Sequence, residues 1–285
     1  VLKAIQSLGI KGLRFAPSAV VNIQNCDLLE FLRDGTITAV EASGIRGALG
    51  DGLLSGEVSL AEPVILRPHG ARPRAIEAGE LQIDVAFLAA SAADAWGNCT
   101  GQVGANPCGS LGYAFVDAQH AGKVIVITDT LVDYPCVPVS ISQQYVDFVV
   151  TVPQIGDPAK IGAGAARLTK NPRDLMIAKM TAELICASSL FRNGFSFQTG
   201  VGAISIACTN YLAEKMRQRN ITASFALGGI TAAIIDLYDA GLVRAVACSQ
   251  SFDAVAAKAI PSRPGVYEID NSDYANPFRR GSYLD

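Results

Sequence analysis

The segment from Phe197 to Ala203 has the residue pattern most able to do chemistry, because it joins a predicted strand to a predicted helix through two glycines. Such a turn presents unpaired backbone N–H groups and the positive end of a helix dipole. The site can hold a phosphate, or it can stabilise the oxyanion that forms when a carbonyl carbon is attacked. We therefore predict that the catalytic groups are the backbone of Gly200, Gly202 and Ala203, with Gln198 as a side-chain donor.

A dinucleotide-binding fingerprint also begins with Gly-x-Gly after a strand, so it is the first alternative. Two features count against it. The third small position is Ser205 rather than glycine, and the next predicted strand ends in two glycines where a ribose-binding acid is expected. A tight turn that binds no ligand is the other alternative for an isolated glycine turn.

A second glycine turn, Leu227–Thr231, follows at the end of the next predicted strand. In open parallel sheets, ligands collect at the carboxyl ends of the strands. We therefore expect Gly228, Gly229 and Thr231 to contact substrate.

Two further segments place basic side chains beside glycines at predicted strand ends. They are Ser43–Gly47, with Gly44, Arg46 and Gly47, and His69–Arg72, with His69, Gly70 and Arg72. Arginine binds carboxylates in a bidentate way, so these residues are predicted to recognise an anionic substrate. The alternatives are solvated loop arginines and a histidine whose polar atoms bond to the local backbone.

The segment Ser91–Gly101 has the polar residues of a turn that closes a buried strand. Ser91 and Asn98 are also candidates for substrate binding, whereas Trp96 is expected to be a packing anchor. No catalytic triad can be proposed, because the two histidines occur in unrelated contexts and no serine lies in a nucleophile elbow.

The elements that must position these residues alternate between short apolar strands and helices, which is typical of an α/β protein with mostly parallel sheets. Residues 84–91, 123–129 and 146–152 predict strands that are buried on both faces. A Gly-, Ala- and Pro-rich stretch, 157–173, predicts a boundary near residue 165 and hence domains 1–165 and 166–285. The helix after Asn171 should bury a stripe of Met176, Met180 and Leu184.

Composition narrows the class of protein. Half of the 285 residues are apolar and 17% are charged, which favours an oligomer, and the net charge of −3 gives no sign of nucleic acid or membrane binding. Seven scattered cysteines and two histidines supply a zinc site poorly, so no metal is expected. Free thiols and the lack of a recognisable secretion signal indicate the cytoplasm.

Several longer strings resemble a known family. DVAFLAASAADAWGNCTG and FSFQTGVGAISIA resemble segments of coenzyme A transferases. SGIRG, HGARPRAIEAGELQIDVAF, AKIGAGAARLTKNPRDLMIA and FALGGIT resemble, more narrowly, the α subunits of citrate lyase, over nearly the whole chain.

The resemblance implies a pair of coenzyme A transferase-type domains and an acyl-carrier-protein transferase activity. In such enzymes, acetyl on the carrier's phosphoribosyl-dephospho-coenzyme A group is exchanged for citrate, which gives citryl-carrier and acetate. The implied partners are the carrier (γ) and a β subunit that cleaves the citryl group. The resemblance also implies segments beyond both ends of this chain, which could hold part of the site.

One departure bears on mechanism. Many transferases of the wider group place a nucleophilic glutamate after the second glycine turn, whereas this chain has Ala232 after Thr231. We therefore expect direct attack of citrate on the thioester, through a mixed anhydride. A covalent enzyme acting on a simpler acid, with Glu77 or Glu80 as nucleophile, is an alternative. A non-catalytic subunit of a larger complex is another.

Overall fold

The computed structural model describes residues 1–18, 28–157, 160–161 and 168–279. The chain forms two compact units, each discontinuous in sequence. The first unit consists of Val1–Phe87, Gln119–Gly122 and Asn271–Asp285, and the second of Leu88–Ala118 and Lys123–Asp270. The domain boundary expected near residue 165 lies outside the described residues, and neither compact unit begins or ends there.

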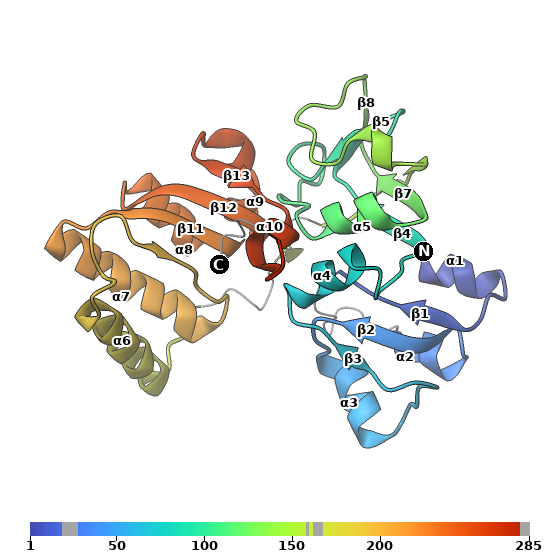
Figure 1. Cartoon of the computed structure of the whole chain (residues 1–285), viewed down its shortest axis with the longest axis horizontal. Coiled ribbons are helices and arrows are strands. Elements are labelled where there is room, and N and C mark those ends of the chain that lie inside the picture. Colours follow the sequence, from blue (N-terminus) through green and yellow to red (C-terminus); the bar gives the residue numbers. More distant parts are fainter. Residues whose placement is uncertain (19–27, 158–159, 162–167, 280–285) are drawn as a thin grey trace. The chain divides into compact units, whose positions relative to one another are not determined.

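The first unit contains a parallel sheet of order β1-β2-β3, with helices packed against it (Figure 1). Its strands are β1 (Leu13–Phe15), β2 (Ile37–Ala42) and β3 (Ile65–Leu66). Its helices are α1 (Leu2–Ser7), α2 (Leu28–Arg33), α3 (Gly47–Ser55), α4 (Ala71–Glu77) and α10 (Asn271–Ala275). Phe31 of α2, Val40 of β2 and Leu49 of α3 belong to its buried core.

The second unit contains two small sheets, β4-β7-β9 and β6-β5-β8. Their elements are β4 (Val85–Ala89), β5 (Ala92–Asp94), β6 (Cys99–Thr100), β7 (Lys123–Thr128), β8 (Leu131–Val132) and β9 (Phe148–Thr151), with α5 (Ala114–His120) and η2 (Gln143–Tyr145) between them. The division between the units falls within β4, after Phe87, and within α5, after Ala118. The expectation that these strands are buried on both faces is wrong for β4 and β9. Phe87 and Phe148 are 43% and 56% exposed, because alternate residues of these strands face outward.

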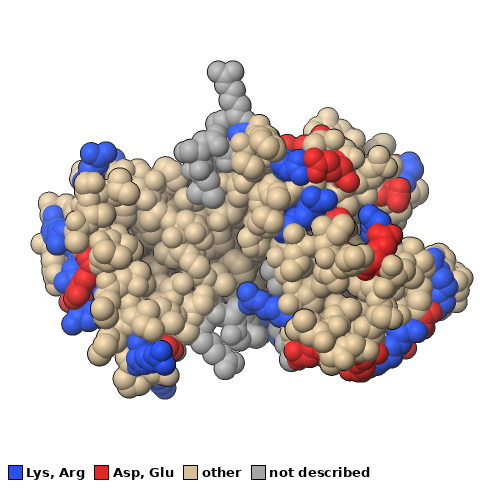
Figure 2. Space-filling model, turned by 60° about the horizontal axis from the view of Figure 1, so that its bottom comes forward, with Lys and Arg blue, Asp and Glu red and all other residues tan. Residues whose placement is uncertain are grey.

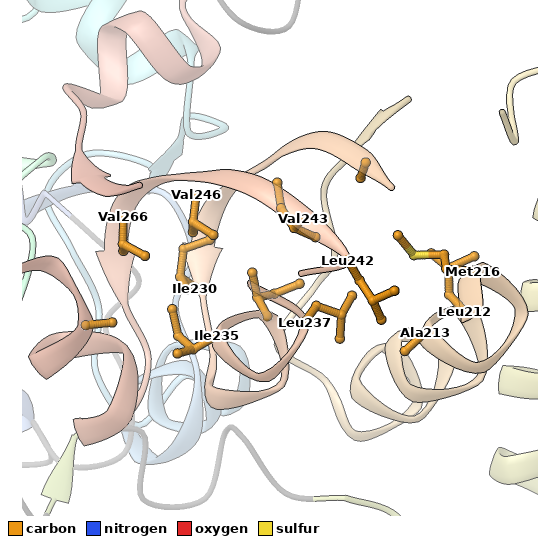
Figure 3. Close-up of a cluster of buried hydrophobic side chains, with 14 of the residues drawn as sticks. Leu212, Ala213, Met216, Ile230, Ile235, Leu237, Leu242, Val243, Val246 and Val266 are labelled. Atoms are coloured by element: carbon orange, nitrogen blue, oxygen red, sulfur yellow. The ribbon is translucent and has the colours of Figure 1, made fainter. Parts of the chain in front are cut away.

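A four-stranded sheet, β10-β11-β12-β13, forms the rest of the second unit, and all its pairs are parallel. Its strands are β10 (Ser196–Phe197), β11 (Ala223–Ile230), β12 (Val243–Ser251) and β13 (Val266–Glu268). Its helices are α6 (Pro172–Ala187), α7 (Ala203–Arg219), α8 (Ala232–Asp239) and α9 (Ala254–Ser262). The core lies between this sheet and its helices, where Met216, Ile235 and Val246 are fully buried (Figure 3). The predicted α/β class with mostly parallel sheets is therefore confirmed.

Helix α6 begins as the sequence predicts, because the Asn171 side chain accepts the Arg173 N–H at 2.9 Å and Pro172 opens the helix. Its predicted buried stripe is wrong. Met176, Met180 and Leu184 are all exposed, and the buried side of the helix is formed by Ala178, Ala182 and Cys186. These small residues pack against α7, which lies between α6 and the sheet (Figure 1).

The surface carries both signs of charge intermixed, without a large area of one sign on the face that Figure 2 shows. In the part of the chain that the structure describes, no helix is long and apolar enough to cross a bilayer.

Candidate functional site

The turn from β10 into α7 has the form that the sequence predicts. Gly202 is the N-cap residue of α7, its carbonyl accepts the Ile206 N–H at 3.0 Å, and no side chain among the described residues caps the helix. The space beside Gly202 is open, since no atom lies within 4 Å of the position that a Cβ would take. The first turn of α7 therefore keeps backbone N–H groups available for an anion or an oxyanion.

Gln198 lies in the same turn, with an exposed side chain. Its Nε2 donates to the Thr199 carbonyl at 2.9 Å, so in this structure it bonds to its own turn. A change of side-chain rotamer frees the amide, because the bond is local and reaches only the next residue. Gln198 can thus donate to a ligand at this end of the sheet.

The carboxylate of Asp253 caps the N-termini of two neighbouring helices, α8 and α9. Its Oδ2 accepts the Ala232 N–H of α8 at 2.6 Å, and its Oδ1 accepts the Ala256 N–H of α9 at 2.8 Å. Sequence reasoning missed Asp253, although an acid just before an apolar helical run is a recognised N-cap signal. Both of these helix starts already hold a negative charge, whereas no described side chain caps the start of α7, which can therefore accept an anion.

The second glycine segment differs from its prediction, because Gly228 and Gly229 lie inside β11 rather than in a turn after it. Gly228 has φ +98°, and the pairing with β12 shifts register between the two glycines, which makes a bulge. A Cβ on Gly229 would lie 2.1 Å from the ring of Phe252. The strand continues to Ile230, and Thr231 is buried as the N-cap residue of α8.

Parallel pairing brings these segments to one edge. Phe197 of β10 pairs with Ala226 of β11, and Ile230 of β11 pairs with Ser251 of β12. The residues that follow each strand therefore lie at the carboxyl edge of this sheet, where α/β proteins bind ligands. The structure thus places Gln198, Gly200, Gly202, Ala203 and Thr231 at a common edge, and adds Asp253 to them.

The first unit has a comparable edge of its own. Ala42 of β2 pairs with Leu66 of β3, so the segments 43–47 and 67–70 follow two neighbouring strands at the same end. Arg46 is the N-cap residue of α3, with an exposed guanidinium that has no ion-pair partner among the described residues. Gly44 and Gly47 flank it, and Gly47 has φ +62°. Arg46 is therefore positioned to bind a carboxylate.

His69 and Gly70 lead into α4 at this edge. The His69 carbonyl accepts the side-chain N–H of Asn271 at 2.8 Å, and burial lowers the pKa of the His69 imidazole, which favours its neutral form. A Cβ on Gly70 would lie 1.8 Å from the Ala275 carbonyl oxygen, so only glycine fits. Arg72 is buried and donates to the Ala16 carbonyl at 3.0 Å, which gives it a structural contact.

Two polar atoms at this edge were not singled out from the sequence. Ser43 Oγ and Asn271 Oδ1 are buried, and neither has a hydrogen-bond partner in the described ranges. Ser43 belongs to the segment of Arg46, but no sequence signal relates Asn271 to His69, about two hundred residues earlier. Buried polar atoms normally have partners, so these two stand out as unsatisfied at this edge.

Ser91 and Asn98 lie elsewhere, in the polar turn that the sequence predicts. Ser91 Oγ donates to the Val103 carbonyl at 2.5 Å, and the Asn98 amide donates to Asp94 and Gln143 at 2.8 Å each. These bonds occupy their polar atoms inside the protein, and a substrate contact for either residue stays a prediction. Trp96 is 68% exposed and contacts Tyr134 edge-on, so its expected role as a packing anchor is wrong.

The acidic candidates for covalent catalysis are already paired. Glu77 accepts hydrogen bonds from Ser272 and Asn276, and Glu80 forms an ion pair with Arg74 that lowers the pKa of Glu80. The thiols of Cys99 and Cys108 are also unsuited to act as nucleophiles, because burial raises the pKa of Cys99 to about 12 and that of Cys108 to about 11. Within the described residues, the glycine turn before α7 is therefore the best-supported centre for chemistry.

Comparison with solved structures identifies the class to which this fold belongs. A 4-hydroxybutyrate CoA-transferase from Porphyromonas gingivalis superposes with a TM-score of 0.55, over 95% of this chain and 66% of that one, at 14% identity. The chain thus has a coenzyme A transferase-type α/β fold.

Closer matches identify the family. The family model for the citrate lyase α subunit matches residues 1–285. The citrate lyase α chain of Haemophilus influenzae is 45% identical over all of this chain and 56% of its own length. A structure described as the putative α subunit of citrate lyase in complex with citrate, from Streptococcus mutans, has a TM-score of 0.94 at 44% identity, and covers 100% of this chain and 55% of that one. The chain belongs to the family of citrate lyase α subunits, and it spans about half the length of the relatives it matches.

Proposed function

We propose that this chain carries the site of a citrate lyase acyl transferase, which exchanges acetate for citrate on the thioester of an acyl carrier protein. The thioester substrate is the acetylated phosphoribosyl-dephospho-coenzyme A group of that carrier (γ). A β subunit would then cleave the citryl product. The names of the relatives support the class of reaction, and the bound citrate of the Streptococcus mutans structure supports the acid.

The proposed reaction needs no enzyme nucleophile. A citrate carboxylate attacks the acetyl carbonyl, the C–S bond breaks, and the thiolate leaves behind a mixed acetyl–citryl anhydride. The thiolate then attacks the citryl carbonyl of the anhydride, the C–O bond breaks, and acetate departs. Each step passes through an oxyanion, so the protein contributes positioning and charge stabilisation.

The observation that carries this proposal is the uncapped start of α7, beside two helix starts that Asp253 already caps. An oxyanion at Gly200–Ala203 meets backbone N–H groups and the positive end of a helix dipole that no described side chain caps. Ala232 supports direct attack, because it cannot form a glutamyl thioester. Within the first unit, the edge that holds Arg46 and His69 is a separate candidate site for a carboxylate.

The test is mass spectrometry of the thioester pool after full-length protein is mixed with acetyl-loaded carrier and citrate. The proposal requires a citryl thioester and free acetate. If the acetyl thioester persists unchanged in the intact assembly, the transferase proposal is wrong and a non-catalytic role is favoured.

A single-turnover version with ¹⁸O-labelled citrate separates the two mechanisms. In direct attack, the bridging oxygen of the anhydride comes from citrate and leaves in the acetate, so the first acetate is labelled. In a covalent mechanism, the first acetate takes an enzyme oxygen and the label appears in the protein. Label in the protein after one turnover contradicts direct attack.

Gln198→Ala should lower turnover about a hundredfold, because the loss of one oxyanion donor typically has an effect of this size. Folding should not change, since the side chain is exposed and bonds only to Thr199. Gln218→Ala, near the other end of α7, is the matched control and should keep full activity. Full activity of Gln198→Ala removes this residue from the mechanism.

Arg46→Gln should raise the KM for citrate about tenfold or more, because it removes a charge-assisted hydrogen bond to a carboxylate. The KM for the acetyl thioester should stay unchanged, which separates citrate recognition from general damage. Arg33→Gln, at an exposed arginine paired with Glu57, serves as the control. Steady-state kinetics with each substrate varied in turn gives both constants.

A further inference from the structure

Helix α6 carries an apolar face that no described residue covers. Met176, Met180 and Leu184 follow one another at one-turn spacing and are 64%, 63% and 74% exposed. The opposite side of the helix is already used, since Ala178, Ala182 and Cys186 are buried against α7. Contiguous apolar side chains of this kind mark an interaction surface in a folded protein.

One flank of this face carries two opposite charges. Lys179 and Glu183 are both exposed, lie one helical turn apart and form no ion pair within the described ranges. Helical geometry places both on the same side of the Met176–Leu184 stripe. A partner that fits this face therefore has an apolar stripe and, on the adjoining flank, a carboxylate opposite Lys179 and a cation opposite Glu183.

Helix α6 itself carries such an apolar stripe and both charges, so a second copy of α6 fits this face. We propose that α6 packs antiparallel against α6 of a second copy of this chain, about a two-fold axis near Met180. Met176 of one copy then faces Leu184 of the other, and the two Met180 side chains meet at the axis. Because a two-fold axis repeats each contact, Lys179 of each copy lies beside Glu183 of the other. This surface is distinct from the glycine turn of the proposed transferase site.

Charge reversal tests the pairing in the full-length chain, by sedimentation of each variant alone and of the two mixed. Lys179→Glu places only carboxylates on the flank, and Glu183→Lys places only ammonium groups there. Each variant alone should therefore associate about tenfold or more weakly than wild type. An equimolar mixture should recover the wild-type dissociation constant, because every contact then joins opposite charges.

Further variants define the surface. Met180→Glu should abolish self-association, because it brings two carboxylates together at the axis. Leu54→Glu on α3, at a leucine that is 90% exposed, should leave self-association unchanged. The proposal is overturned if the wild type does not self-associate, if both reversed variants associate as tightly as wild type, or if their mixture is no tighter than either alone. Those results would assign the face to another part of a longer chain or to a different subunit.

Discussion

Asp94→Ala should lower the free energy of unfolding by about 4 kcal/mol or more, because the carboxylate is fully buried and holds a turn together. Oδ1 accepts the backbone N–H groups of Trp96, Gly97 and Asn98 at 2.9, 2.9 and 3.2 Å. Oδ2 accepts the Asn98 amide and the Cys136 N–H at 2.8 Å each. Alanine removes the side-chain acceptor of the Trp96, Asn98 and Cys136 backbone N–H groups, whereas the Gly97 N–H keeps the carbonyl of residue 94 and the Asn98 amide keeps Gln143. Urea unfolding of both proteins measures the difference.

The control is Asp51→Ala, at an exposed aspartate of α3, which should change stability by less than about 0.5 kcal/mol. Asp94→Asn should fall between the two variants. Asparagine keeps one oxygen that can accept the backbone N–H groups, but its NH₂ group then faces two other donors, the Asn98 amide and the Cys136 N–H. A loss below about 1 kcal/mol for Asp94→Ala would show that water or a local rearrangement satisfies the turn.

The same carboxylate gives the stability a pH dependence. Burial raises the pKa of Asp94, but the hydrogen bonds from Cys136, Asn98 and Trp96 outweigh burial, and the pKa is lowered overall. A lowered folded-state pKa contributes stability above the unfolded pKa of about 3.9, and this contribution is lost as the pH falls through the folded value. The deficit of Asp94→Ala should therefore be largest near pH 7 and shrink below about pH 4. A deficit that is constant over this range contradicts the assignment.

Gly104→Ala should lower the free energy of unfolding by about 3 kcal/mol or more, because two independent costs coincide at this residue. Gly104 has φ +103°, a conformation that L-residues rarely adopt. A Cβ there would also lie 2.0 Å from the Ser91 carbonyl oxygen, which belongs to backbone that cannot move aside cheaply. The variant should unfold at a much lower urea concentration.

Gly194→Ala is the matched control, because it separates the two costs. Gly194 has φ +85°, yet no atom lies within 4 Å of the position of its Cβ. Only the conformational cost, about 1–2 kcal/mol, applies there. Equal losses at both positions would show that the contact with Ser91 relaxes.

Much of the local structure follows from the sequence, because short-range rules decide it. Helix α7 runs from Ala203 to Arg219, as expected from a glycine turn followed by an apolar helical period. Arg46 lies at a strand end as predicted, since strand and turn signals are local. These rules place the candidate site residues on their elements.

The predictions that are wrong concern features that depend on packing between residues far apart in the sequence. Periodicity shows that Met176, Met180 and Leu184 share a face, but only the assembled protein decides whether that face is covered, and here alanines pack against α7 instead. Gly228 and Gly229 predict a turn, yet both stay paired with β12, and the register shifts between them. No short-range signal relates Asn271 to His69.

The double cap formed by Asp253 restricts how this site could change in evolution. A glutamate at position 232 would bring a second carboxylate to a residue whose backbone N–H already donates to Asp253 at 2.6 Å. Two like charges so close raise the pKa of at least one of them, which leaves less of the ionised nucleophile. Removing Asp253 first would free the starts of both α8 and α9 at a cost in stability. A carboxylate nucleophile at position 232 would therefore need a second, linked substitution at Asp253.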